Sequence, residues 1–292
     1  MSNYTYRGTH TVKNIFGVTD YNKLERIEAA IVKARYTEID AGSGPKGKFD
    51  ADLIKALHRH LFQDVYEWAG HTRDELVSLS DGTVATMPIM QKAEGQPFSI
   101  GAAIPAALGA VEKKLHAGNY LRGLPRKEFA ERAADVMAEI NTVHPFREGN
   151  GRTQRVFMEQ LAHDAGHNLD FTVISKERMI QASIAAHERD DTSMMRRMFD
   201  EISDPERVLR LRKSIAALEK LDVDWNNRYV ATITPGHNVE LVLAGVAGDQ
   251  FMARTRSEIL FGRVSDLPKP RPQQGQTFTL TMPSRTQQQG NA

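Results

Sequence analysis

The chain has 292 residues, of which 40% are hydrophobic and 26% are charged, as is usual for globular proteins. Its 38 basic and 37 acidic residues leave a formal net charge of +1, so no overall field draws it to nucleic acid or to an anionic membrane. It contains no cysteine, which excludes disulfide bonds and thiolate catalysis. We therefore expect neither a nucleic-acid partner nor a disulfide-stabilised fold.

Helical periodicity dominates from about residue 20 to residue 215. Apolar residues recur every three or four positions over Phe49–Trp68, which predicts a helix with one buried face that ends at Gly70. His58 and His60 would face different ways on it, which argues against a shared metal ion. Similar spacing predicts helices over about 125–141, 151–165 and 175–187.

A β-hairpin is predicted inside this helical region, over residues 74–90. The stretch "DELVSLSDGTVATMPIM" places a Ser-Asp-Gly turn between two short runs of strand-forming residues. An isolated hairpin is unstable in water, so we expect this one to pack on the helices.

Short β-rich runs broken by Gly, Pro and Asn follow from about residue 222 and predict a small all-β domain. The end of the chain is rich in Pro, Gln and Gly, a composition typical of linkers and tails. We therefore expect a mainly α protein divided into an N-terminal extension (1–20), a helical domain (21–215), a small β domain (216–285) and a tail (286–292).

The densest chemistry lies in residues 144–155, "HPFREGNGRTQR". Gly149-Asn150-Gly151 stands where a predicted helix begins, so its amides and the helix dipole could bind an anion, although the same glycines would also suit a simple helix-entry turn. Arg152 and Arg155 lie three apart on the first turn and oppose the helix dipole. Their guanidinium groups suit a bound polyphosphate.

Three further residues of this stretch have a structural and a chemical interpretation. Glu148 could cap the helix, or hold a Mg²⁺ ion beside phosphate oxygens. His144 could be a packed core residue, or a base that takes a proton from an attacking hydroxyl group. Phe146 lies between polar residues and is expected to point inward and anchor the loop.

The full stretch resembles the signature of the Fic family, H-x-F-x-(D/E)-G-N-G-R-x-x-R. The upstream "VYEWAGHTR", the hairpin, which looks like the family's flap, and the helix ending "AAHERDD" extend the resemblance over about residues 20–205. The resemblance implies a Fic-type helical bundle that transfers AMP from ATP to a hydroxyl side chain of a target protein.

The resemblance also implies a role for each residue of the motif. His144 would act as the base toward the target hydroxyl, and Glu148 would hold Mg²⁺ between the α- and β-phosphates. The remaining polar positions would bind the phosphates of ATP, with the last of them on the terminal phosphate: Gly149, Asn150, Gly151, Arg152 and Arg155.

The open edge of the hairpin is expected to bind the target. It comprises Thr83, Val84, Ala85, Thr86 and Met87. Main-chain hydrogen bonds to an added strand would place a Tyr, Thr or Ser hydroxyl over the site whatever its neighbours are.

A Fic core followed by a small β domain resembles the Bartonella effector proteins, which carry an OB-like domain and then a type IV secretion signal domain. This resemblance implies an effector that is made in the bacterial cytoplasm and secreted into a host cell. No secretory signal is expected, since the first ten residues have no apolar segment, and no apolar run approaches the ~20 residues of a membrane span.

Fic proteins are held inactive by a glutamate in an S/T-x-x-x-E-G/N helix, which pairs with the arginine at the position of Arg155. This pattern does not occur in the sequence. We therefore expect a separate, small antitoxin-like inhibitor that carries it. Two alternatives to AMP transfer remain open: transfer of phosphate or phosphocholine from another nucleotide on the same core, and a non-enzymatic interaction scaffold.

Overall fold

The computed structural model describes residues 3–91, 95–233 and 238–281. Their contacts divide into two compact units. The first unit runs through Leu169 and includes Ala185–Arg196, and the second comprises Asp170–Ile184 and the described residues from Arg197 onward. The predicted tail at 286–292 lies outside the described residues. The domain boundary that the sequence predicts at residue 215 stays a prediction.

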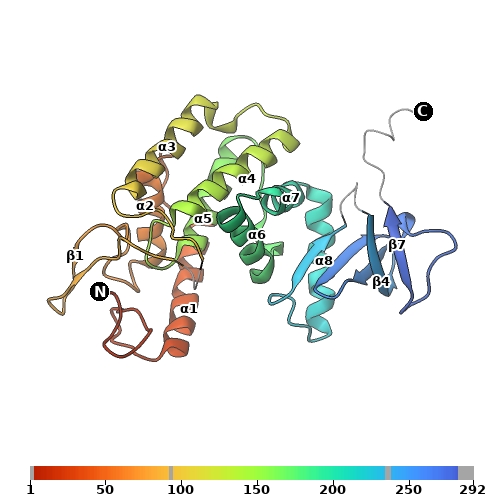
Figure 1. Ribbon diagram of the computed structural model, residues 1–292, viewed down its shortest axis with the longest axis horizontal. Coiled ribbons are helices and arrows are strands. Elements are labelled where there is room, and N and C mark those ends of the chain that lie inside the picture. Colours follow the sequence, from red (N-terminus) through yellow and green to blue (C-terminus); the bar gives the residue numbers. More distant parts are fainter. Residues whose placement is uncertain (1–2, 92–94, 234–237, 282–292) are drawn as a thin grey trace. The chain divides into compact units, whose positions relative to one another are not determined.

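The first unit is helical and confirms the predicted fold class (Figure 1). Helix α5 contacts both α2 and α4, α1 packs against α2, and α3 packs against α4. The helices of this unit are α1 (Tyr21–Asp40), α2 (Ala51–Phe62), α3 (Ala103–Ala117), α4 (Arg126–Val143) and α5 (Asn150–Asp164). Large fully buried side chains fill the space between them, among them Leu57, Leu61, Phe129 and Phe157.

Helix α2 is shorter than predicted. We expected it to end at Gly70, and it ends at Phe62. The amides of Val65 and Tyr66 both donate to the Phe62 carbonyl at 2.9 Å, which closes the helix and turns the chain. Trp68 is still buried, so the apolar spacing continued through a non-helical turn and gave no sign of the helix end. Gly70, with φ of 88°, belongs to this turn.

The other predicted helices are confirmed with small shifts at their ends. Helix α4 begins directly after Pro125 and ends before His144, as expected from the proline at 145. Helices α5 and α6 (Lys176–Arg189) match the predicted 151–165 and 175–187 within two residues. Helices α1 and α3 were not delimited from the sequence, where they gave only a general helical signal.

The predicted hairpin is present as strands β1 (Val77–Ser78) and β2 (Val84–Ala85), paired antiparallel. Its turn is anchored from the N-terminal segment. Lys13 Nζ lies 2.7 Å from the Asp81 carboxylate and donates to the Thr83 hydroxyl at 2.7 Å. This cation lowers the pKa of Asp81 to about 2. The expected packing of the hairpin is therefore provided in part by the N-terminal extension.

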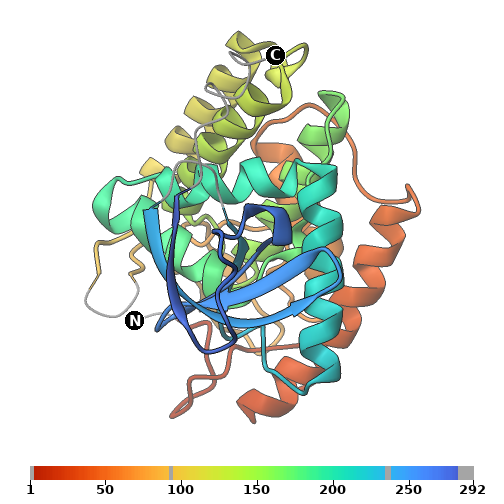
Figure 2. The ribbon, with the colours of Figure 1, turned by 90° about the vertical axis from the view of Figure 1, so that its right-hand side faces the viewer.

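The second unit combines helices α7 (Ser193–Ile202) and α8 (Pro205–Lys220) with a five-stranded sheet, within the described residues. The sheet has the order β3-β6-β5-β4-β7, in which only the β3–β6 pair is parallel. Helix α8 contacts β3 and β6, and Figure 2 shows it beside the sheet. The strands are β3 (Tyr229–Thr232), β4 (Asn238–Ala247), β5 (Gln250–Arg254), β6 (Glu258–Arg263) and β7 (Thr277–Thr281). The predicted β domain is confirmed, and an OB-like fold for it stays a prediction.

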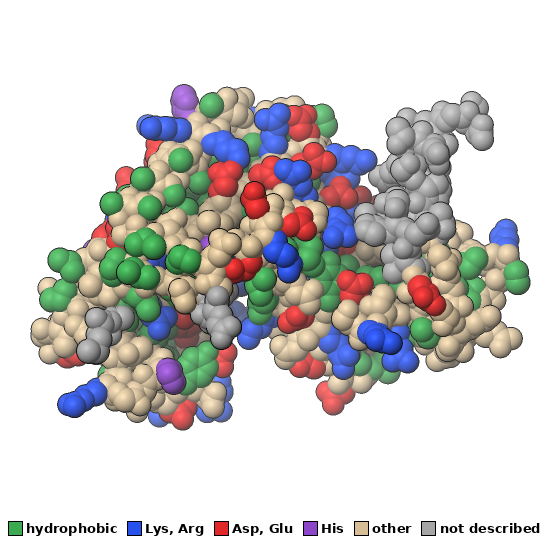
Figure 3. All heavy atoms as spheres, in the orientation of Figure 1, with side chains coloured by type: hydrophobic (Ala, Val, Ile, Leu, Met, Phe, Trp, Pro, Cys, Tyr) green, Lys and Arg blue, Asp and Glu red, His purple; other side chains and the backbone are tan. Residues whose placement is uncertain are grey.

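Acidic and basic side chains are interspersed on the face shown in Figure 3, in keeping with the formal net charge of +1. Among the helices that the structure describes, none has the length and apolarity that a membrane span needs.

A buried carboxylate, Glu201, organises the second unit. It is fully buried, and it pairs with the buried guanidinium of Arg178 and, at 3.3 Å, with Arg207. The amide of Thr232 in β3 donates to the same carboxylate at 2.6 Å. The two arginines outweigh the effect of burial and lower the pKa of Glu201. Glu201 therefore joins α6, α7, α8 and the first strand of the sheet through one charge.

Replacing Glu201 by Gln should destabilise this unit by about 3–5 kcal/mol, because it leaves Arg178 buried without a counter-charge. Urea denaturation measures the change in the free energy of unfolding. The control is Glu206→Gln, whose carboxylate forms an exposed ion pair with Arg263 at 2.6 Å and should contribute less than about 1 kcal/mol. Equal losses in the two variants would contradict the role of Glu201.

Candidate active site

The motif loop joins α4 to α5 and is bounded by two left-handed residues. His144 has φ of 47° at the end of α4, and Gly149 has φ of 82° at the start of α5. A β-carbon on Gly149 would lie 2.4 Å from the ring of Phe62, so both its conformation and its neighbour require glycine. A β-carbon on Gly151 would meet nothing within 4 Å, so this position faces open space.

Asn150 closes the loop through its side chain. Its Oδ1 accepts the amide of Phe146 at 2.9 Å, and its Nδ2 donates to the carbonyl of Phe146 at 2.7 Å. Phe146 itself is fully buried and stacks on His58 with ring centroids 3.8 Å apart. The side chain of Asn150 thus shapes the loop, which leaves its main-chain amide for a ligand.

The amides at the start of α5 point to an anion site. The first hydrogen bond of the helix ladder runs from the amide of Thr153 to the carbonyl of Gly149 at 3.1 Å. The amides of Asn150, Gly151 and Arg152 precede this bond, where helix geometry provides no carbonyl for them. They lie at the positive end of the helix dipole, which favours a negatively charged ligand.

His58 supports the loop from α2. Its Nδ1 accepts the amide of Gly70 at 2.8 Å, so the proton must be on Nε2, which donates to the carbonyl of Glu148 at 3.0 Å. Burial lowers its pKa to about 3, and the positive charge of Arg152 acts in the same direction. His58 is therefore a neutral residue that positions the loop.

Arg73 connects the loop to the hairpin. Its side chain is fully buried and donates to the carbonyls of His144 at 2.9 Å, Met87 at 3.1 Å and Pro88 at 2.8 Å. It also donates to the carbonyl of Ser99. Burial lowers the pKa of Arg73. In the sequence Arg73 is the last residue of "VYEWAGHTR", and no local pattern there predicts its role.

The ring of His144 is held by stacking. The Phe98 ring lies parallel to it, with centroids 4.0 Å apart and an angle of 10° between the planes. Phe98 also stacks on His187, with ring centroids 4.5 Å apart, and Nε2 of His187 is 3.0 Å from the carbonyl of Gln96. The orientation of the His144 imidazole is therefore defined by both its main chain and its ring contacts.

The two arginines of the motif have different surroundings. The guanidinium of Arg152 lies over the ring of Phe62 at 4.7 Å and pairs with the buried carboxylate of Glu28 in α1. Arg155 donates from Nε to the carbonyl of Gly151 at 3.2 Å, and within the described ranges no carboxylate lies within 4.0 Å of its guanidinium. Arg152 is thus held in place, whereas Arg155 can pair with a ligand.

Glu148 is exposed beside these groups. Its carboxylate oxygens lie 3.8 Å from Nη2 of Arg152 and 3.9 Å from Nη1 of Arg147. No group of three or more His, Cys, Asp or Glu side chains suited to a metal ion occurs among the described residues. One exposed carboxylate beside an anion site fits Mg²⁺, which commonly takes one or two carboxylates and completes its coordination with phosphate oxygens and water.

The five hairpin residues expected to bind a target differ in their availability. The Thr83 carbonyl accepts the amide of Leu79 at 2.8 Å, so Thr83 faces β1 and the main chain of Val84 faces the open edge. The carbonyl of Val84 accepts from the side chain of Asn3 at 3.1 Å. Ala85 is buried. The hydroxyl of Thr86 lies 3.4 Å from the carbonyl of Arg73, and the amide of Met87 donates to the same carbonyl at 2.6 Å.

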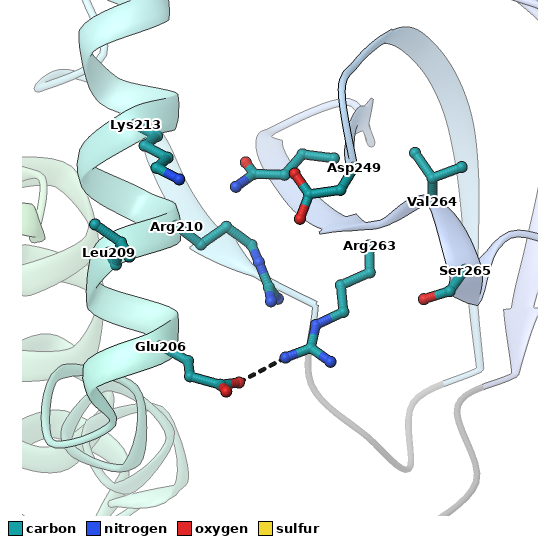
Figure 4. Close-up of a pocket in the computed structure, with 9 residues that line it drawn as sticks. Glu206, Leu209, Arg210, Lys213, Asp249, Arg263, Val264 and Ser265 are labelled. Atoms are coloured by element: carbon teal, nitrogen blue, oxygen red, sulfur yellow. Dashed lines mark hydrogen bonds and ion pairs between the residues drawn. The ribbon is translucent and has the colours of Figure 1, made fainter.

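The second unit contains a pocket of about 370 Å³ between α8 and the sheet (Figure 4). Charges of both signs line it, among them Arg210, Lys213, Asp249 and the Arg263–Glu206 ion pair. None of its lining residues belongs to the motif. The candidate active site is therefore the loop between α4 and α5.

Comparison with known proteins agrees with this location. The family model described as the Fic/DOC family matches residues 48–162. A protein adenylyltransferase of Bartonella henselae is 34% identical over 288 residues, which cover 96% of this chain and 52% of that protein. The chain therefore spans about half the length of this relative.

Two solved structures are similar. The type IV secretion system effector protein BepA superposes with a TM-score of 0.88 at 32% identity, over 96% of each chain. BepC from Bartonella tribocorum, a VirB-translocated effector with bound AMPPNP, superposes with a TM-score of 0.67 at 42% identity, over 70% of this chain and 97% of that one.

The buried His58 predicts a specific dependence of stability on pH. Its folded pKa of about 3 is below the ordinary value of 6.5, so the unfolded chain binds the additional proton as the pH falls. The neutral His58 should contribute fully to the free energy of unfolding above pH 6.5. Below pH 6.5 this contribution should fall by up to about 1.4 kcal/mol per pH unit. The difference in unfolding free energy between the wild type and His58→Gln should therefore narrow from pH 7 to pH 5 in urea denaturation. A difference that stays constant from pH 7 to pH 5 would exclude the neutral burial of His58.

Proposed function

Because the chain belongs to the Fic/DOC family, we propose that it transfers AMP from ATP to a Tyr, Thr or Ser hydroxyl of a target protein. The observation that carries the proposal is a hydrogen-bonded loop that fixes the position of His144 relative to the free amides at the start of α5. The name of the Bartonella henselae relative and the AMPPNP bound to BepC support it.

His144 would act on the attacking group. Its imidazole takes the proton of the target hydroxyl as the hydroxyl oxygen bonds to the α-phosphorus, and the bond from that phosphorus to the bridging oxygen breaks, releasing pyrophosphate. The stacked ring of Phe98 and the bond from Arg73 to the His144 carbonyl fix the direction of the imidazole. Such positioning supplies a large part of the rate enhancement in phosphoryl-type transfers.

The other motif residues would bind the donor. The amides of Gly149, Asn150 and Gly151 and the guanidinium of Arg152 would hold the inner phosphates, and Arg155 would take the terminal one. The amide of Gly149 donates to the Glu148 carboxylate at 3.3 Å and would have to exchange this partner for a phosphate. Glu148 would hold Mg²⁺ as its single protein carboxylate. When bound, the metal ion would neutralise part of the phosphate charge.

The hairpin would present the target by β-augmentation. The outward-facing main chain of Val84 provides hydrogen-bonding groups for an added strand, flanked by Thr83 and Thr86, although its carbonyl contact with Asn3 would have to be exchanged. Both main-chain groups of Met87 bond to Arg73, so Met87 would mark the end of this edge. Arg73 would thereby fix the position of the docking edge relative to His144.

We also propose that the protein acts as an effector, made in the bacterial cytoplasm and delivered into host cells by type IV secretion. The likeness to BepA, described as a type IV secretion system effector protein, and to BepC, described as a VirB-translocated effector, supports this role. The second unit would serve as an interaction or spacer domain, and an OB-like fold for it would not require nucleic acid, because its predicted strands lack interleaved basic and aromatic residues.

Labelled ATP tests the reaction. The purified chain, a host-cell lysate and Mg²⁺ should give protein label from α-³²P-ATP and none from γ-³²P-ATP. Label from the γ position alone would mean phosphate transfer. No label from either, with CDP-[³H]choline also inactive, would favour a non-enzymatic scaffold.

The control for this experiment is His144→Ala, which removes the base and leaves the phosphate site intact. Label transfer should fall by about 10²–10⁴-fold or more. AMPPNP should still bind, because the imidazole acts on the target and not on the donor. Near-normal transfer in this variant would remove His144 from the mechanism.

Inhibition in trans would act at Arg155, whose guanidinium forms no ion pair with the described residues. The chain alone should modify itself with ATP and Mg²⁺. A small partner carrying S/T-x-x-x-E-G/N should suppress this, and changing its Glu to Gly should restore activity while the complex persists, because one ion pair is a small part of an interface. A folded, nucleotide-binding chain that is inert alone would contradict external control.

A further inference from the structure

Glu28 is a buried carboxylate that the proposed reaction does not use. It lies in α1, between Leu24 and Val32 on the buried face of that helix, and only 7% of its surface is exposed. A carboxylate in such a position is costly unless it is paired and hydrogen-bonded. Its partners therefore explain why the position carries a charge.

Both oxygens of Glu28 are used. Oε1 accepts from Nη1 of Arg152, and Oε2 accepts from the hydroxyl of Tyr66. Tyr66 is itself buried and stacks on Trp68 with ring centroids 4.4 Å apart. Burial and the charge of Glu28 both raise the pKa of Tyr66, so its hydroxyl remains a donor. Tyr66 thus holds the Glu28 oxygen that Arg152 does not use.

The contact reaches the candidate phosphate site through one side chain. The guanidinium of Arg152 rests on the ring of Phe62, with Nη1 directed to Glu28 and Nη2 3.8 Å from the Glu148 carboxylate. Arg152 stands on the first turn of α5, where the helix dipole repels a cation. A guanidinium there needs an external restraint to stay at the mouth of the site, and Glu28 is the buried group that supplies one.

We propose that Glu28 is a positioning residue, which holds the guanidinium of Arg152 where it can meet the phosphates of a nucleotide. The chain of contacts Tyr66–Glu28–Arg152 joins α1 and the segment after α2 to the first turn of α5. The inference rests on the proposed function in taking the ligand to be a nucleotide, and its test needs binding alone. If the chain did not transfer AMP, the effect of Glu28 on nucleotide binding could still be measured.

The experiment is calorimetric titration of the full chain with AMPPNP and Mg²⁺. Glu28→Gln keeps the shape of the side chain and removes its charge, and the Kd should rise about tenfold, the effect expected for weakening one charged hydrogen bond. Glu28→Asp keeps the charge and shortens the reach, so its loss should be intermediate. Tyr66→Phe leaves the ion pair in place and should raise the Kd by about twofold to threefold.

A double-mutant cycle separates positioning from a merely structural role. In an Arg152→Ala background, Glu28→Gln should change the Kd by less than about twofold, because the residue through which it acts is gone. A structural role would lower the melting temperature and leave the Kd of the single variant unchanged. KM for ATP should follow the Kd in the active chain.

Wild-type affinity for AMPPNP in folded Glu28→Gln would overturn the proposal. If that variant does not fold, Glu28→Asp takes its place, and wild-type affinity with the carboxylate withdrawn from Arg152 would overturn the proposal equally. An undiminished effect of Glu28→Gln in the Arg152→Ala background would also do so, because it would show action by another route.

Discussion

The site depends on one buried cation, Arg73, which is held by main-chain carbonyls. Its guanidinium bonds to His144 at the end of α4, to Met87 and Pro88 after the hairpin, and to Ser99 before α3. A charge without solvent is tolerated here because many carbonyl dipoles point at it and because the end of α4 carries the negative end of its dipole. Three segments of the chain therefore meet at one guanidinium.

The hydrogen bonds of Arg73 also provide partners for carbonyl groups at the end of α4. The last carbonyls of a helix have no partner within it, and a buried helix end must find others. Here the carbonyl of Thr142 accepts the amide of Ser99 at 3.2 Å, and the carbonyls of Val143 and His144 accept from Arg73. With these bonds made, His144 can adopt the left-handed conformation that turns the chain into the loop. The conformation of the proposed base thus follows from satisfying the helix end.

Local chemistry made the loop and most helices predictable from the sequence. A proline at 145 stops α4, and a glycine at 149 admits a positive φ at the start of α5, and both effects act within a few residues. The end of α2 was mispredicted because Val65 and Trp68 are buried in a turn and continue the apolar spacing.

The supporting residues of the site were not predictable in the same way. Arg73 is separated by 71 residues from His144, and Glu28 by 124 residues from Arg152. An arginine or glutamate at such a distance has no local pattern, because its role comes from the packing of whole helices. Arg73 alone had a signal, since it ends the quoted segment "VYEWAGHTR".

The two helix ends of the loop require opposite charges, and this explains the residues between them. The carbonyl end of α4 takes the cation of Arg73, and the amide end of α5 is left for an anion. His58 bonds between them to the carbonyl of Glu148 and stacks on Phe146. A charged side chain at 58 would add a field of its own beside the phosphate site, and a cation could not accept the amide of Gly70. A neutral imidazole can donate and accept at once, so it supports the loop and leaves the charge of the site to the arginines and the ligand.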